Sequence, residues 1–196
     1  MRLGLLLPLL LSMSLPGPVT AQAGTSPEEP LRARGTAGML LKGTSIAGKD
    51  RVLLGGWAGL TFGDHFSLGG GGVALLREVH LTGSGSGTGF ELGMGYGGIL
   101  LGLRYPLRAR VAARLGILVG AGHAEVRDRL TGREVGADNF GVLEPEAALS
   151  LSLLSWLHLG GGVGYRMTWG VGDIPLVPPE EFRGATGTLS LRVGGD

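Results

Sequence analysis

Apolar and polar residues alternate with a period of two along much of the chain. Within the segment 139–153, odd positions such as Leu143 and Leu149 are apolar, whereas even positions carry Glu144, Glu146 and two serines. Later segments repeat this split. A period of two is expected of a β-strand, because successive side chains point to opposite faces. Glycine is frequent in the same segments, and in a helix each would cost about 1 kcal/mol relative to alanine. The pattern therefore predicts strands.

Eight glycine-rich segments of this kind follow one another along the chain. They are expected at Gly38–Thr44, Arg51–Phe62, Phe66–Leu76, Phe90–Tyr105, Val111–Arg127, Asn139–Leu153, Leu157–Trp169 and Gly184–Val193. Short connections are expected at Gly63–His65, Pro106–Arg110 and Leu154–Trp156. Longer connections are expected at Ser45–Asp50, Arg77–Gly89, Asp128–Asp138 and Gly170–Arg183. Short turns on one rim and longer loops on the other are typical of an up-and-down antiparallel barrel.

The second face of the strands is glycine-rich and carries a few long charged side chains. An eight-stranded barrel has an interior just wide enough for side chains, and this face would fill it. The same face turned to water would be poorly soluble and would expose many backbone groups. The expected fold class is therefore all-β, an eight-stranded antiparallel up-and-down β-barrel of the transmembrane type. A soluble periplasmic or secreted barrel that binds an apolar ligand is the alternative.

An interior polar network is expected on this second face. By alternation it comprises Glu144, Glu146, Arg104, Arg114, Arg166 and Arg192. If the sixth hairpin connection turns about Ser155, Glu144 lies opposite Arg166, and we expect an ion pair with Glu146 as a diagonal second acceptor. Pro145 removes one donor from the ladder, so a bulge or local break is expected beside it.

The N-terminus has the pattern of a secretory signal peptide. Arg2 gives a positive start, Leu3–Leu15 is apolar, and Ala21–Ala23 forms an A-x-A cleavage site. We therefore expect a signal peptide over 1–23 that is cleaved after Ala23, a disordered periplasmic tail over 24–37 and a barrel domain over 38–196. The chain has no cysteine, which excludes disulfides, thiolate chemistry and a lipid-anchored N-terminal cysteine.

Two stretches of the sequence resemble a known family. The stretch Val52–Gly72, VLLGGWAGLTFGDHFSLGGGG, and Val142–Glu146 followed by Trp156–Arg166, WLHLGGGVGYR, are similar to uncharacterised bacterial outer-membrane β-barrel-domain proteins of the small eight-stranded type. The similarity covers about residues 38–193 and implies the fold and the outer membrane, but no catalytic residue. An outer-membrane barrel would contact membrane lipid, and periplasmic chaperones and the barrel-assembly machinery during insertion. The non-aromatic ending Val193–Asp196 departs from the usual aromatic C-terminus.

Few residues of the chain suggest chemistry. No histidine lies beside another histidine at metal-ligand spacing, so neither a metal nor a cofactor is expected. The segment Gly83–Gly89 superficially resembles a phosphate-binding loop but lacks the lysine and the following helix. The net charge of +1 is spread along the chain, and no nucleic-acid partner is expected.

A catalytic Ser–His pair is not expected. His123 and Glu125 share one face, and alternation puts Ser150 and Ser152 on the other.

The leading hypothesis is a small outer-membrane barrel with a filled interior, no open pore and no enzyme activity. Its role would be structural or would depend on an extracellular partner at the long loops. A barrel-embedded lipid-modifying enzyme is a further alternative. Aromatic residues expected to mark the membrane interfaces are Trp57, Tyr105, Trp156 and Trp169.

Overall fold

The computed structural model describes residues 33–63, 65–77, 79–82, 89–172, 174 and 177–194. Its strands are β1 (Ala33–Ile46), β2 (Lys49–Phe62), β3 (Phe66–Leu75), β4 (Val79–Thr82), β5 (Gly89–Arg108), β6 (Val111–Asp128), β7 (Glu134–Leu154), β8 (Leu157–Trp169) and β9 (Gly184–Gly194). A short 3-10 helix, η1 (Pro179–Phe182), precedes β9. The predicted signal peptide and the segment Gly83–Thr88 lie outside the described residues. No helix among those described is long and apolar enough to cross a membrane.

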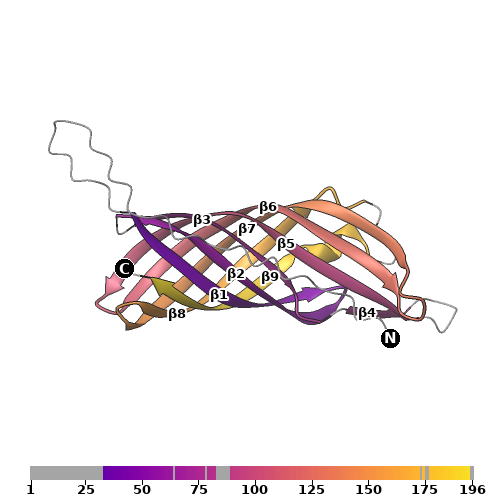
Figure 1. The fold of residues 1–196 in the computed structure, drawn as a ribbon, viewed down its shortest axis with the longest axis horizontal. Helices are drawn as coiled ribbons and strands as arrows, with labels where there is room; N and C mark the ends of the chain where they lie inside the picture. The colour runs from indigo at the N-terminus through magenta and orange to yellow at the C-terminus, as the bar shows by residue number, and fades with distance from the viewer. Residues whose placement is uncertain are drawn as a thin grey trace. The chain divides into compact units, whose positions relative to one another are not determined.

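The strands close into a ring (Figure 1). Each pairs with its neighbours antiparallel, β1 pairs with β9, and β3 pairs with β5. The short β4 also pairs with β5, beyond the end of β3, so β3 and β4 together occupy one position in the ring. The barrel therefore has eight antiparallel positions, as the sequence predicts. Closure matters energetically because it leaves no sheet edge around the main wall.

The alternation predicted from the sequence is confirmed, with the apolar face turned outward. Leu101, Leu115, Val163 and Leu189 are exposed on the outer surface. Residues of the opposite parity, such as Thr186, are buried in the interior. A soluble protein buries its apolar strand face, whereas this barrel exposes it.

Several strand boundaries differ from the sequence prediction; β7, for example, begins at Glu134 rather than at Asn139. β1 begins at Ala33 rather than Gly38, because Ala33–Ala37 continue the ladder and pair with Ala58–Phe62 of β2. These five residues were expected in the disordered tail; the rest of that tail lies outside the described residues. The connection after β1 was expected to be long. It is a tight turn at Ala47 and Gly48, whose φ values of 51° and 65° suit a primed hairpin turn that matches strand twist.

The barrel has a short-turn end and a long-loop end. The short-turn end carries the β2–β3, β5–β6 and β7–β8 turns, as well as the start of β1 and the end of β9. At the long-loop end, β5, β6 and β7 continue beyond their neighbours. β8 pairs with β7 only from Gly141 onward, so Glu134–Phe140 extend past that ladder and pair with β6. Together with β4 they form a projecting sheet, defined here as residues 79–82, 89–95, 122–128 and 134–140.

An apolar cluster fills the lumen toward the long-loop end. Leu53, Leu92 and Phe140 from the wall pack with Ile174 and Phe182 from the loop between β8 and β9. The rings of Phe140 and Phe182 lie 5.9 Å apart. Ile174 and Phe182 of this loop therefore lie within the long-loop end of the lumen and pack against its wall.

Glycines inside the wall let neighbouring strands lie close together. A Cβ atom at Gly98 would collide with the backbone of Val119 and Gly120, whereas a Cβ at Gly161, on the outer face, meets nothing within 4 Å. We predict that Gly98→Ala destabilises the barrel by about 1–3 kcal/mol through overpacking. Gly161→Ala should leave stability unchanged or raise it slightly. Urea unfolding in detergent measures both; equal midpoints for the two variants would contradict the close approach.

Candidate functional site

Glu144 and Arg166 lie inside the barrel, as expected. Their side chains are 1% and 0% exposed. Leu143 pairs with Met167 and Glu146 with Gly164, so the predicted register about Ser155 is correct. No pair forms at Glu144 or Pro145 within this described ladder, which is the predicted local break beside the proline.

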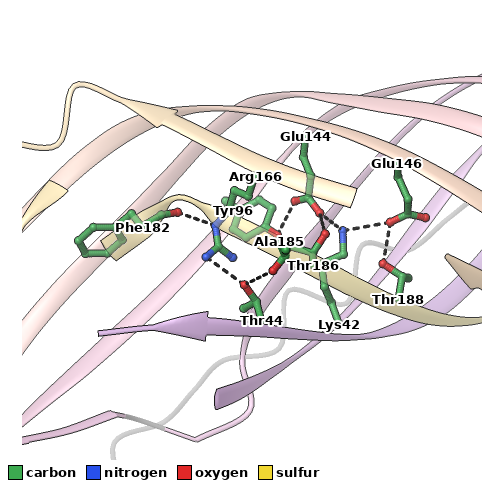
Figure 2. Close-up of polar contacts among 10 residues, drawn as sticks. All are labelled: Lys42, Thr44, Tyr96, Glu144, Glu146, Arg166, Phe182, Ala185, Thr186 and Thr188. Atoms are coloured by element: carbon green, nitrogen blue, oxygen red, sulfur yellow. Dashed lines mark hydrogen bonds and ion pairs between the residues drawn. The ribbon is translucent and has the colours of Figure 1, made fainter. Parts of the chain in front are cut away.

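Glu144 forms its ion pair with Lys42 rather than with Arg166 (Figure 2). Lys42, on β1, donates a hydrogen bond across the lumen to Oε1 of Glu144. The hydroxyl of Tyr96 donates to Oε2 at 2.6 Å, and that of Thr186 donates to Oε1 at 3.0 Å. A carboxylate with this many donors is satisfied despite its burial.

Glu146 belongs to the same cluster. Its Oε2 lies 3.4 Å from Nζ of Lys42 and accepts a hydrogen bond from Thr188 at 2.6 Å. Lys42 therefore bridges two carboxylates, and β1, β7 and β9 are tied together through the lumen. We call Lys42, Tyr96, Glu144, Glu146 and Arg166 the charged layer.

Arg166 turns toward the long-loop end. Its Nε donates to the carbonyl oxygen of Phe182 at 2.7 Å, and its Nη2 to Oγ1 of Thr44 at 3.4 Å. Its guanidinium also lies 5.7 Å from the centre of the Tyr96 ring. The predicted ion pair with Glu144 is wrong, although the two residues occupy opposite positions. The reason is that the Phe182 carbonyl, brought in by the loop, takes the Arg166 donor, while Lys42 from the far wall reaches Glu144.

The remaining predicted arginines lie nearer the short-turn end. Arg104 and Arg114 are directly paired on β5 and β6, and Arg192 is paired with His158 on β9 and β8. Arg192 and His158 are buried. The predicted interior residues thus divide into two groups, since Glu144, Glu146 and Arg166 share one layer and the other arginines occupy a second.

A cavity of about 150 Å³ lies between these groups. Side chains from both ends line it, among them Lys42, Glu146, Arg114, His158 and Arg192. Several glycines also line it, including Gly102, Gly116 and Gly160. Space remains here because glycine contributes no side chain to the lumen. At about 30 Å³ for each water molecule, a cavity of this size has room for roughly five.

A Ser–His contact that the sequence did not suggest lies at the short-turn end. Oγ of Ser152 lies 2.9 Å from Nδ1 of His158, whose Nε2 lies 3.3 Å from the carbonyl oxygen of Gly194. If Nε2–H donates to that carbonyl, Nδ1 accepts a hydrogen bond from the hydroxyl group of Ser152. Both side chains lie on the lumen side of the wall, where a lipid outside the barrel does not reach them. The contact ties β7, β8 and β9 together.

His123 and Glu125 lie on the outer face of β6, as the alternation predicts. Nδ1 of His123 lies 3.0 Å from Oδ1 of Asn139, and Glu125 forms an ion pair with Arg127 at 2.9 Å. The structure does not bring His123 to Ser150 or Ser152, whose parity is inward.

No protein-family model matches the chain, and no curated protein sequence matches it. Among solved structures, it is similar to Neisserial surface protein A, with a TM-score of 0.52 and 14% identity over 83% of this chain and 96% of that one. It is also similar to the attachment invasion locus protein Ail of Yersinia pestis, with a TM-score of 0.47 and 12% identity over 83% and 96%. For OprG from Pseudomonas aeruginosa the TM-score is 0.38, with 12% identity over 83% and 91%.

The likeness to Neisserial surface protein A shows the fold alone. It confirms the predicted fold class and the resemblance to small eight-stranded outer-membrane barrels at the level of architecture.

Breaking the Lys42–Glu144 pair should destabilise the barrel strongly. Lys42→Met leaves the Glu144 carboxylate buried without its cation, and we expect a loss of about 3–5 kcal/mol, less if water enters from the cavity. Glu144→Gln should cost a similar amount, and the double variant should lose less than the sum of the two. Urea unfolding measures the cycle. Glu125→Gln, which breaks an exposed pair, is the control and should change stability by at most about 1 kcal/mol. Additive losses would contradict direct coupling.

Proposed function

We propose that the protein is a small barrel of the outer membrane with a structural or loop-mediated interaction role. The observation that carries this proposal is the outward-facing apolar surface of a closed ring whose buried charged side chains lie inside. Leu115 and Val163, for example, are 60% and 70% exposed on the outer wall. Exposure of such a large apolar surface to water is unfavourable, whereas contact with the lipid chains of a membrane is favourable.

Exposed aromatic residues support the same location. Trp156 lies at the short-turn end, and Trp169 lies at the end of β8 toward the long loops. Tyr105 is exposed near the β5–β6 turn. Aromatic residues at the two edges of an apolar surface are typical of membrane interfaces. Trp57 departs from this arrangement, because it points inward and lines the cavity.

The interior supports a plugged barrel. The apolar cluster around Phe182 fills the lumen toward the long-loop end, and the charged layer crosses it below. The cavity near the short-turn end is therefore bounded by packed side chains on one side. The interior apolar residues pack against one another, which gives no support to the alternative of a soluble barrel with an apolar ligand.

The projecting sheet is the best candidate for contact with a partner. Its loop at 129–133 is held by Asp128, whose Oδ1 accepts hydrogen bonds from the N–H groups of Leu130 and Thr131 at 2.8 and 2.9 Å. The bond from Thr131 holds the pKa of the Asp128 carboxyl below its usual range. Leu130 at the tip is 77% exposed. An ordered loop that presents an apolar side chain suits an extracellular protein partner.

The remaining parts of the proposal are a signal peptide cleaved after Ala23, insertion with periplasmic chaperones and the barrel-assembly machinery, and the absence of enzyme activity. Support for a non-enzymatic role comes from the position of Ser152 and His158, which face the lumen rather than the lipid.

The membrane location predicts the effect of charge on the outer wall. The wild-type protein should be recovered with the outer membrane and require detergent for release. Leu115→Arg should lower the stability of the lipid-embedded barrel by about 2–4 kcal/mol if it lies near the bilayer midplane. Leu130→Arg is the matched control in the loop and should have no such effect. Recovery of the wild-type protein in the soluble fraction without detergent would contradict the location and favour the soluble alternative.

The filled lumen predicts that purified protein forms no stable channel. Eight strands enclose little space, and the packed side chains at Phe182 and Glu144 occupy it. Planar-bilayer recordings should show no reproducible conductance steps. Steps of constant size from independent preparations would show that the interior opens.

A further inference from the structure

A glycine between two leucines leaves an apolar groove on the outer wall toward the short-turn end. Gly161 on β8 pairs with Leu149 on β7 and with Leu189 on β9, and these leucines are 57% and 53% exposed. A Cβ atom at Gly161 would meet nothing within 4 Å. The groove has a volume of about 270 Å³, and its other apolar side chains come from Val111, Leu151 and Leu159.

The lining and the position of the groove suit a hydrocarbon chain. Its leucine side chains belong to the outward face of β7, β8 and β9, which contacts lipid in the membrane location proposed above. An empty depression in an apolar surface forfeits dispersion contacts along its lining, so a chain that enters it gains them. An acyl chain is narrow and unbranched, and it can lie in the space that one missing side chain leaves.

Two arginines flank the groove where it approaches the β5–β6 turn. Val111 lines the groove, Arg108 is its ladder partner on β5, and Arg110 directly precedes it. The N–H of Ser152 donates to the carbonyl oxygen of Arg110 at 2.8 Å, which ties this turn to β7. Both arginines are exposed. Neither forms an ion pair or a side-chain hydrogen bond with another described residue, and the described part of the short-turn end contains no aspartate or glutamate.

We propose that the groove and these two arginines bind one anionic phospholipid of the leaflet at the short-turn end, with an acyl chain in the groove and the phosphate at Arg108 and Arg110. This inference rests on the membrane location proposed above. Arginine suits a phosphate because its planar guanidinium presents paired donors to the phosphate oxygens. Two positive charges favour a headgroup with a net negative charge, such as phosphatidylglycerol, over phosphatidylethanolamine, whose ammonium group they repel.

Native mass spectrometry of the protein purified in a non-ionic detergent tests the site. Phosphatidylglycerol and phosphatidylethanolamine with identical acyl chains compete at equal concentration, so that only the headgroup differs. We expect a single lipid to remain bound to the barrel. Phosphatidylglycerol should be retained about fivefold or more over phosphatidylethanolamine, since a basic residue near an anionic lipid changes the affinity by about that factor.

The two parts of the site have separate variants. Arg108→Gln combined with Arg110→Gln should remove the preference for phosphatidylglycerol and leave the retention of phosphatidylethanolamine unchanged. Gly161→Leu fills the groove and should lower the retention of both lipids severalfold. Gly187→Leu, on the exposed face of β9 where a Cβ atom also meets nothing within 4 Å, is the matched control for the groove. Arg127→Gln, at the long-loop end, is the matched control for charge, and both controls should retain lipid like the wild type.

The outcomes separate this site from the membrane location. A protein that needs detergent for release but shows no preference for phosphatidylglycerol would overturn the lipid site and leave the location intact. The site is also wrong if the double arginine variant retains lipid as Arg127→Gln does, or if Gly161→Leu retains it as Gly187→Leu does. The arginine comparison holds even where Gly161→Leu does not fold, because both arginines are exposed. Release of the wild-type protein without detergent would overturn the site and the location together.

Discussion

Closure of eight strands into a narrow ring is the constraint on which the rest of this structure depends. A ring of this size has an interior only about as wide as the side chains that fill it. Two of its inward positions, Gly98 and Gly120, face each other across β5 and β6 without room for a Cβ atom. Glycine at such sites lets strands approach, and it leaves space elsewhere for long charged residues. The high glycine content and the few buried charges are therefore two consequences of one geometry.

The same geometry decides how buried charges find partners. In an open sheet, Glu144 would have only its neighbours on β6 and β8 within reach. In a closed ring, the opposite wall is also near, and Lys42 from β1 bridges Glu144 and Glu146. Such a contact links strands that are distant in sequence and adds a cross-lumen tie to the hydrogen-bonded wall. Removing one member leaves a buried charge without a partner. The loss of stability is therefore larger than the net stabilisation that the pair contributes relative to apolar residues at the same positions.

The local sequence pattern predicts the strands and their register, but it does not predict the contacts across the lumen. The outward leucines of β7, the inward Glu144 and the register that sets Leu143 against Met167 all follow from alternation and turn position. The partner of Glu144 does not, because it depends on which part of β1 faces β7 after closure. The sequence around Lys42 also gives no sign that its side chain points inward. Met39, Leu40 and Leu41 are apolar on both faces, which masks the alternation that would have shown Lys42 as inward. Strand ends also depend on long-range pairing, since Ala33–Ala37 are strand only because β2 is present to pair with them.

The lumen differs in chemistry from one end to the other, and this difference follows from where the loops are long. At the long-loop end, the segment before β9 is long enough to place Phe182 inside the mouth, where apolar wall residues such as Leu92 and Phe140 pack against it. The described turns at the opposite end are short and supply no comparable apolar plug. Polar residues such as Ser152, His158 and Arg192 fill that half instead. Apolar packing from a loop at one end and polar side chains at the other therefore fill most of the lumen, and a cavity of about 150 Å³ remains between them.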